Sequence, residues 1–317
     1  MREYGTKHLC LWSSRCPIIV LPDVMSATAG RNRVSCLPGR YTWLQRMAIS
    51  PSQARAVTGL YSLTRRSGLL ETGFGRKLFT TSYFLYKRYL EDPFAALARK
   101  RPELFRGGDI LDIGANIGYT ASLFAQAADA DATVYAFEPE PFNFRLLQST
   151  VQDRRLQGKV VPIQSAVGER SGEIELWIND HHHADHRIAT DNLRASYKGP
   201  EEYVTIPITS VDEFVAASVA GRPICLIKID VQGYELAVCR GMAATIALQR
   251  RAAVAIEYMP DAMKELGYDP LAMLDWFRER EFRMYSLGKN GDLVEGLSDE
   301  LSAKGYVDLI FSQAPLI

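Results

Sequence analysis

The sequence predicts an α/β fold built on a parallel, doubly wound sheet with helices on both faces. Short apolar runs alternate with helix-like segments through residues 106–317, and alternation at this spacing is typical of parallel sheets. Two of the runs, 110–113 and 224–229, each have an aspartate within one residue of their carboxyl end, and a glycine turn and a helix follow each run. Ligands of open α/β sheets bind beyond the carboxyl ends of the strands, so the site is expected there.

The first 105 residues do not share this alternation. Prolines interrupt each apolar run in residues 1–46, and we expect a poorly ordered extension there. Residues 47–105 have a helical pattern and predict a helical N-terminal cap, with Gly73 and Gly75 separating two helices. The second of these helices, 77–98, is rich in aromatic residues. It is expected to pack on the main domain at 106–317, with a lid over an acceptor pocket as the alternative.

Charge is divided unevenly along the chain, although the formal net charge is zero. Residues 1–105 hold 17 Lys and Arg against six Asp and Glu, whereas residues 106–317 hold 20 against 31. An acidic α/β domain does not favour nucleic acid as a partner, because a phosphate backbone requires a basic face. We expect the basic part to fold against the acidic domain. Peripheral contact with a membrane surface is the alternative.

The compartment is predicted from cysteines and hydropathy. None of the five cysteines forms a C-x-x-C pair, and an unpatterned odd number is typical of a reducing compartment. No apolar stretch approaches the roughly 18 residues that a membrane-spanning helix needs. We therefore expect a cytoplasmic protein without a transmembrane segment.

The most informative motif is the turn that follows the first predicted strand. Asp112 lies at the carboxyl end of the strand, and Gly114 and Gly118 precede a predicted helix at 119–128. The glycines permit a ligand to approach the main chain near the N–H groups of the helix start. The pattern Asp-x-Gly-x-x-x-Gly lacks the third glycine of a dinucleotide motif. Its carboxylate would repel a pyrophosphate but suits an ammonium or sulfonium group, and S-adenosylmethionine (SAM) carries both.

The next strands predict a nucleoside site. Glu138 ends the strand at 133–137, where a carboxylate can accept hydrogen bonds from both ribose hydroxyls of an adenosine. Ser165 and Ala166 follow the strand at 159–163 and would flank an adenine ring. Glu138 would also suit a nicotinamide cofactor, so an NAD-dependent oxidoreductase is the alternative function. The missing third glycine and the acid at position 112 count against it.

Asp230 ends the strand at 224–229, in a position equivalent to those of Asp112 and Glu138. We expect the three carboxylates to converge on one crevice. Unpaired neighbouring carboxylates repel each other, and a cationic ligand would offset that repulsion. Asp230 is the first candidate for the general base, or for the residue that positions an acceptor hydroxyl.

Four of the five histidines lie in the polar segment 179–202, at positions 181, 182, 183 and 186. Histidine serves as a general base and as a metal ligand. His183 and His186 are weaker candidates for the base. No acid or cysteine at a metal-ligand spacing completes a set, so no metal site is predicted. A solvated loop is the simplest alternative.

The remaining elements follow from periodicity. They are strands at 173–178, 203–207 and 252–257, helices at 209–217 and 270–281, and an antiparallel pair at the sheet edge formed by 282–287 and 306–311.

Three segments together resemble the FkbM family of SAM-dependent methyltransferases. They are Asp112-Ile-Gly-Ala-Asn-Ile-Gly118, Phe137-Glu138-Pro139 and Lys228-Ile-Asp-Val-Gln-Gly-Tyr-Glu235. The resemblance covers residues 83–311. It implies the class I methyltransferase fold, a Rossmann-like, mostly parallel sheet of seven strands with one antiparallel strand. The implied activity is methyl transfer from SAM to a hydroxyl, often on a sugar or a natural-product-like small molecule.

The resemblance also implies roles for individual residues. Those that would hold the methionine end of SAM are Asp112, Gly114, Asn116 and Gly118. Glu138 would bind the ribose, Ser165 and Ala166 would lie near adenine, and Asp230 would lie near the transferred methyl group. The family often has Glu where this chain has Gln232, so this chain lacks the negative charge of that Glu, although Gln still donates and accepts hydrogen bonds. A methyltransferase-like binding protein without activity is a further alternative.

Overall fold

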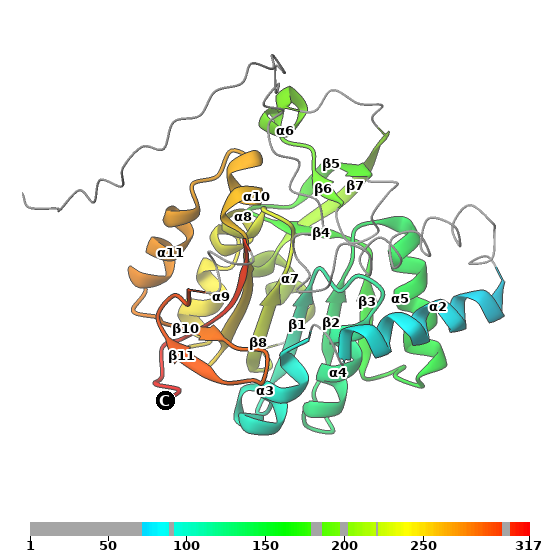
Figure 1. Cartoon of the computed structure of the whole chain (residues 1–317), viewed down its shortest axis with the longest axis horizontal. Helices are drawn as coiled ribbons and strands as arrows, with labels where there is room; N and C mark the ends of the chain where they lie inside the picture. Colours follow the sequence, from blue (N-terminus) through cyan, green and yellow to red (C-terminus); the bar gives the residue numbers. More distant parts are fainter. Residues whose placement is uncertain (1–71, 89–91, 179–185, 197–201, 220, 300–304) are drawn as a thin grey trace, which may run out of the picture. The chain divides into compact units, whose positions relative to one another are not determined.

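The computed structural model describes residues 72–88, 92–178, 186–196, 202–219, 221–299 and 305–317. The predicted extension at 1–46, the first predicted helix of the cap and His181, His182 and His183 lie outside these residues. The described residues form an α/β arrangement with a central sheet and helices on both of its faces (Figure 1).

The central sheet has the strand order β11-β10-β12-β9-β8-β1-β2-β3. Its strands are β1 (Asp109–Ile113), β2 (Val134–Phe137), β3 (Val160–Ile163), β8 (Ile224–Ile229), β9 (Ala253–Tyr258), β10 (Arg283–Leu287), β11 (Leu293–Glu295) and β12 (Val307–Ser312). Strands β3, β2, β1, β8 and β9 pair in parallel, and β12 runs antiparallel to both β9 and β10. The predicted seven-stranded core with one antiparallel strand is therefore present, and the short β11 adds an eighth strand. The predicted antiparallel pair is β10 and β12, but β11 rather than this pair forms the edge.

Alternation along the strands directs side chains to two separate apolar cores. In β1, Leu111 and Ile113 face one core and Ile110 faces the other. Apolar residues from the helices that follow β7, β8 and β9 complete the first core, and residues from the helices that precede β1 and β2 and follow β2 complete the second. Both faces of the sheet are covered, which explains why its central strands are apolar runs without polar alternation.

The described helices are α2 (Gly73–Tyr86), α3 (Phe94–Lys100), η4 (Pro102–Phe105), α4 (Tyr119–Ala127), α5 (Pro141–Asp153), α6 (Asp191–Ser196), α7 (Val211–Ser218), α8 (Glu235–Arg240), α9 (Ala243–Leu248), α10 (Pro260–Glu265) and α11 (Pro270–Arg278). The helices predicted at 119–128, 209–217 and 270–281 correspond to α4, α7 and α11, whereas α6, α9 and α10 were not predicted. Of the helices in the described ranges, none combines the length and the apolar character needed to cross a membrane.

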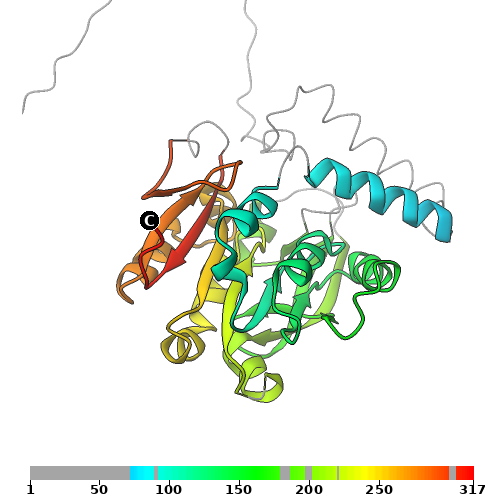
Figure 2. The same cartoon turned by 90° about the horizontal axis from the view of Figure 1, so that it is seen from below.

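The prediction for the cap was wrong in two details. Gly73 and Gly75 do not separate helices but lie in the first turn of α2, where the Thr72 hydroxyl caps the helix by accepting from the Gly75 N–H. The aromatic run is also divided, because Asp92 caps a new helix, α3, at Phe94. Helix α2 packs beside α5 (Figure 2), and its aromatic residues join a small apolar cluster on the main domain.

A second, smaller sheet was not anticipated. It has the order β4-β7-β5-β6 and consists of β4 (Ala166–Gly168), β5 (Gly172–Ile178), β6 (Arg187–Ile188) and β7 (Glu202–Ser210). The polar segment at 179–202 therefore contributes a strand, β6, and a helix, α6, in its described part. Strand β7 continues past its predicted end to Ser210, whose hydroxyl caps α7 by accepting from the Glu213 N–H.

Candidate functional site

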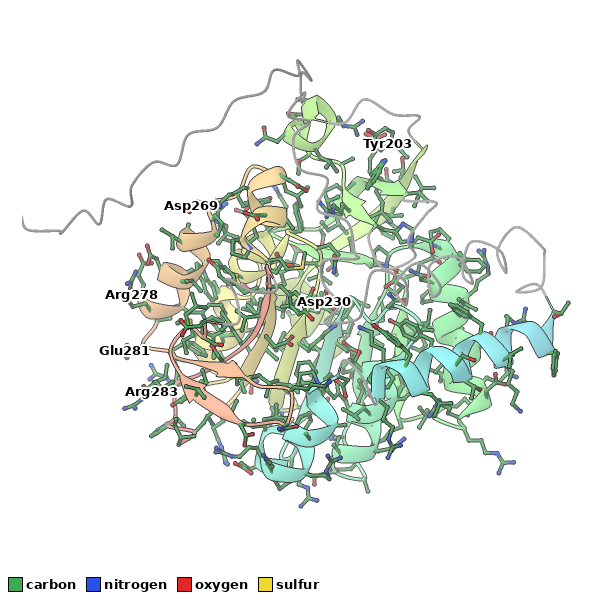
Figure 3. All side chains as sticks on the ribbon, viewed as in Figure 1. Tyr203, Asp230, Asp269, Arg278, Glu281 and Arg283 are labelled. Carbon is green, nitrogen blue, oxygen red and sulfur yellow. The ribbon has the colours of Figure 1, made fainter. Side chains whose placement is uncertain are left out.

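A cavity lies at the carboxyl ends of the parallel strands, where the sequence predicted the site. Its volume is about 150 Å³. It is surrounded by the turns after β1 and β8, the ends of β2, β3 and β9 and the first residues of β12. Parts of α2 and of the second sheet complete its wall. It brings together most of the predicted site residues, namely Gly114, Asn116, Glu138, Ser165, Ala166 and Asp230. In Figure 3, Asp230 is labelled near the middle of the view, whereas Arg278 and Glu281 are labelled at its left edge.

The turn after β1 has a backbone that requires glycine and asparagine. Gly114 has φ +81°, and a Cβ there would lie 1.9 Å from the carbonyl oxygen of Asp230. Gly114 is therefore needed for close approach of the two turns as well as for its own conformation. Asn116 has φ +50°, which asparagine tolerates better than most residues. Its buried Oδ1 has no hydrogen-bond partner among the described residues, so a ligand N–H could satisfy it.

Gly118 directly precedes helix α4, as predicted. It has φ +88° and starts helix α4, and a Cβ there would lie 2.7 Å from the Leu147 side chain. Gly118 is not among the cavity-lining residues. Its geometry is explained by the packing of the turn on α5, so any contribution to ligand binding comes through the shape of the turn.

Asp112 lies directly behind the cavity wall rather than on it. Its side chain is completely buried and absent from the cavity lining. The Thr120 hydroxyl donates to Asp112 Oδ2 at 2.6 Å, and Lys228 Nζ lies 3.6 Å from Oδ1. Burial raises the pKa of Asp112 above its usual value, and the nearby Lys228 charge opposes that rise. Because Thr120 and Lys228 both line the cavity, Asp112 is in a position to act through them.

Lys228 is the functional residue that the sequence analysis missed. It pairs with Asp112 in the β1–β8 register and is almost fully buried. Its ammonium group donates to Asp230 Oδ2 at 3.3 Å and to the Gly114 carbonyl at 3.2 Å. Burial lowers the pKa of Lys228 because it favours the neutral amine. The attraction of the Asp230 and Asp112 carboxylates for the ammonium group is the larger effect, so the pKa of Lys228 is raised. The repulsion between these carboxylates is therefore already offset by a lysine of the protein.

The turn after β8 holds Asp230 from its other side. Gln232 donates from Nε2 to Asp230 Oδ1 at 2.8 Å and to Glu257 Oε2 at 3.4 Å. A glutamate at this position could not donate these hydrogen bonds. Glu235 stabilises the same turn by accepting from the Gly233 N–H at 3.0 Å and from the Val231 N–H at 3.3 Å. This support matters because Gln232 has φ +58°, a strained conformation for that residue.

Glu138 is oriented by two backbone N–H groups. Its Oε2 accepts from Asn116 at 2.9 Å and its Oε1 from Glu140 at 3.0 Å. The residue is only 5% exposed, and burial raises the pKa of its carboxyl to about 8. Next to it along the rim, the Ser165 hydroxyl donates to the carbonyl groups of Ala166 at 2.8 Å and Pro207 at 3.2 Å. The ends of β2 and β3 thus form one wall of the cavity.

His186 lines the cavity on the β2 side. Its buried Nε2 lies 4.0 Å from Glu140 Oε2, and Glu140 is the residue that caps α5. This places His186 beside the turn that carries Glu138. Within the described ranges, no three His, Cys, Asp or Glu side chains are grouped so as to hold a metal ion.

The family assignment rests on a sequence match. Residues 112–284 match the model of the methyltransferase FkbM domain. The chain belongs to the FkbM methyltransferase family. It is therefore a SAM-dependent methyltransferase, and both the predicted family resemblance and the predicted class I α/β fold are confirmed. The NAD-dependent oxidoreductase alternative does not agree with this assignment.

Two FkbM-type relatives are similar over different lengths. The chain is 33% identical over 192 residues to the hexuronic acid methyltransferase AglP of Haloferax volcanii, covering 59% of this chain and 70% of AglP. It is 37% identical over 89 residues to the 31-O-demethyl-FK506 methyltransferase FkbM of Streptomyces tacrolimicus, covering 28% of this chain and 32% of that protein. Among solved structures, methyltransferase FkbM from Methylobacillus flagellatus aligns with a TM-score of 0.43 at 15% identity, over 84% of this chain and 56% of that one.

Proposed function

We propose that this FkbM-family enzyme binds SAM in the cavity and transfers its methyl group to a hydroxyl of a sugar or natural-product-like small molecule. The observation that carries the proposal is the meeting of Glu138, Asn116 and Asp230 around one cavity at the carboxyl rim of the sheet. The names of the two relatives, one acting on a hexuronic acid and one on an O-demethyl natural product, support this class of acceptor.

The residues at the carboxyl ends of β1, β2 and β3 form one half of the cavity and fit SAM, the methyl donor. Glu138 would accept hydrogen bonds from the ribose hydroxyls, and Ser165 and Ala166 would flank the adenine. The unsatisfied Oδ1 of Asn116 would accept from an N–H group at the methionine end. Gly114 contributes the open turn, and Asp112 supports it through Thr120 and Lys228. SAM, when bound, supplies a methyl group that is activated by a sulfonium sulfur.

Asp230 is the proposed general base. Lys228 and Gln232 each donate to one of its oxygens, which keeps the carboxylate in a fixed orientation. Its side chain is 28% exposed, whereas that of Asp112 is fully buried, so an acceptor hydroxyl can reach Asp230 and give up its proton there. His186, beside Glu140, is better placed to contact the donor half. His183 stays a candidate from sequence alone, and contact of the basic N-terminal part with a membrane surface also stays a prediction.

Substitutions on the two halves of the cavity separate binding from catalysis. In Glu138→Gln, we expect SAM affinity measured by calorimetry to fall at least about tenfold, because an oxygen that can accept from a ribose hydroxyl is replaced by an amide NH₂ group that cannot. In Asp230→Asn, we expect turnover to fall by roughly 10²–10⁴-fold with SAM affinity nearly unchanged, because proton removal is lost and the donor contacts are kept. The control is Glu279→Gln, because the Glu279 side chain is 73% exposed.

Two results would contradict the proposal. One is unchanged SAM affinity in Glu138→Gln, and the other is equal thermal stabilisation of the wild-type enzyme by NADH and by S-adenosylhomocysteine. A normal methyl transfer rate in Asp230→Asn would remove only the assigned base and leave the donor site in place.

A further inference from the structure

The N-terminal cap contributes side chains to the wall of the cavity. Helix α2 lies outside residues 112–284, the segment that matches the family model. Tyr83, in its last turn, and Lys87, the residue at its C-terminal end, nevertheless line the cavity together with residues of the turn after β1. The donor half of the cavity is therefore not built from the family segment alone, and the cap has side chains in a position to contact a ligand.

The end of α2 packs on the turn that is proposed to hold the methionine end of SAM. Tyr83 and Phe84 share an apolar cluster with Ile117, which lies in that turn. Tyr119, the first residue of α4, also belongs to the cluster, and its ring meets that of Phe84 edge to face at a centroid distance of 5.2 Å. Lys87 follows Tyr83 by one helical turn, and its Nζ lies 5.9 Å from the centre of the Tyr83 ring. The ammonium group of Lys87 is thus held near the proposed donor turn.

The electrostatic effect of Lys87 extends to the same place. Asp92 accepts a hydrogen bond of 3.0 Å from the Tyr119 hydroxyl, and both residues line the cavity. Burial raises the pKa of Asp92 and that of Tyr119, and the positive charge of Lys87 opposes both rises. The ammonium group of Lys87 therefore lies close enough to the start of α4 to stabilise a negative charge there.

The methionine end of SAM brings a negative charge to this place. Its carboxylate and its ammonium group share one carbon atom, so both must bind beside the turn if Asn116 Oδ1 accepts from the ammonium group. The Asn116 N–H already contacts the Glu138 carboxylate at 2.9 Å. The positive groups of SAM have acids of the protein as partners, but a carboxylate that leaves water also requires donors of its own. The protein must therefore supply a cationic or N–H donor to this carboxylate.

Three side chains of the described lining carry, or can carry, a positive charge, and they are Lys87, His186 and Lys228. The ammonium group of Lys228 is directed to two carboxylates and one backbone carbonyl, which matches its three N–H donors. His186 lies on the β2 side of the cavity, which is the side proposed for the ribose. Lys87 lies at the methionine end, and because its ammonium group has three donors, a contact with one protein group leaves others for a ligand.

We propose that Lys87 binds the carboxylate at the methionine end of SAM, which makes the N-terminal cap a part of the donor site. The proposal rests on the proposed binding of SAM in the cavity. The contact is a charge-assisted hydrogen bond between an ammonium group and a carboxylate. It joins the donor to α2 and adds to the apolar contacts of Tyr83 and Phe84 that hold α2 against the turn after β1.

The test compares SAM with decarboxylated SAM, which keeps the adenosine, sulfonium and ammonium groups and lacks only the carboxylate. Calorimetry with the full chain gives both dissociation constants. We expect the wild-type enzyme to bind SAM at least about tenfold more tightly than decarboxylated SAM, because a charge-assisted hydrogen bond is lost with the carboxylate. In Lys87→Met, this preference should fall at least about fivefold, because the carboxylate has lost its partner in both cases. Lys87→Arg keeps the charge and should restore the preference.

The control is Lys77→Met, because Lys77 lies on the exposed side of the same helix and is not among the lining residues. It should keep the wild-type preference for SAM. Lys87→Gln is a second variant, so that one remains if the other does not fold.

The preference for SAM separates ligand binding from a purely structural role of Lys87. A structural role would weaken the binding of both ligands equally and leave the preference unchanged. An unchanged preference in Lys87→Met and Lys87→Gln, or equal affinity of the wild-type enzyme for the two ligands, would overturn the proposal and leave the donor site standing. Failure of the wild-type enzyme to bind SAM would refute the proposed function, and this proposal with it.

Discussion

Lys228 shows how a single buried residue makes the site chemically feasible. Asp112 and Asp230 lie at the ends of neighbouring strands, and both would be costly to hold there as charged groups without a counter-charge. Lys228 lies in the register opposite Asp112 and two residues before Asp230, on the same face of β8. Its ammonium group therefore reaches both carboxylates and the carbonyl group of Gly114.

Replacing Lys228 by methionine should destabilise the fold. Lys228→Met leaves Asp112 buried without its cation, and breaking a buried ion pair on one side costs about 3–5 kcal/mol. Urea unfolding should show that decrease in the free energy of unfolding. The control Lys264→Met removes a surface ion pair from a lysine that is 63% exposed and should change stability by less than about 1 kcal/mol. A loss in Lys228→Met no larger than in the control would show that Asp112 does not depend on this lysine.

At the scale of elements, the site is formed by two turns that touch. The turn after β1 approaches the turn after β8 so closely that Gly114 has no room for a side chain beside the Asp230 carbonyl. The second turn is held by Glu235 and contains a residue other than glycine, Gln232, with positive φ. The relative position of the proposed base, Asp230, and the proposed donor turn therefore depends on this close approach of the two turns.

Gly114→Ala tests this contact, with Gly158→Ala as a control of equal strain. Gly114 and Gly158 have nearly the same φ, +81° and +82°, but a Cβ at Gly158 meets nothing within 4 Å. The left-handed conformation costs each variant about 1–2 kcal/mol, and overlap with Asp230 should add about 1–3 kcal/mol more in Gly114→Ala. Thermal unfolding measures the difference, and activity should be lost only in Gly114→Ala. Equal stability and activity in the two variants would show that the turns do not need this close approach.

At the scale of the whole molecule, burial of acids should make stability depend on pH. Burial raises the pKa of Glu138 to about 8, and those of Glu235 and Asp308 to about 7. Between the usual pKa of a carboxyl and these values, the folded state holds protons that the unfolded chain has released. Folding is then favoured at low pH within this window, and stability falls as pH rises through it.

We expect the ligand-free enzyme to be less stable at pH 8 than at pH 6. Each group that is protonated only in the folded state lowers the free energy of unfolding by about 1.4 kcal/mol for each unit by which the pH rises. Urea unfolding at several pH values gives the slope of the free energy of unfolding against pH. This slope should become shallower in Glu138→Gln, because the amide of Gln does not release a proton in this pH range. The surface substitution Glu295→Gln, at a side chain 59% exposed, should leave the slope unchanged. A stability that rises from pH 6 to pH 8 in the wild type would refute this prediction.

Local sequence was sufficient for the parallel strands of the central sheet and for several of the residues that line the cavity, among them Gly114, Glu138 and Asp230. Apolar runs and glycine turns are local features, so they predicted β1, β2, β3, β8 and β9 and the carboxyl edge where the site lies. The second sheet was missed because its strands pair across long separations, β4 with β7 and β5 with β7. The edge of the central sheet was also misplaced, because a three-residue strand such as β11 has no pattern of its own.

The sequence by itself determined that this chain is a class I α/β methyltransferase of the FkbM family, because the motifs that define it are contiguous. Only the tertiary structure decided how charge is arranged around the cavity. Pairing of β1 with β8 moved Asp112 behind the wall and placed Lys228 between two acids, and pairing of β9 with β12 brought Asp308 beside Glu257. These pairs are separated by 116 and 51 positions in the chain, so no local pattern connects them. The physical reason is that an electrostatic interaction depends on distance in space and on burial, and strand register sets both.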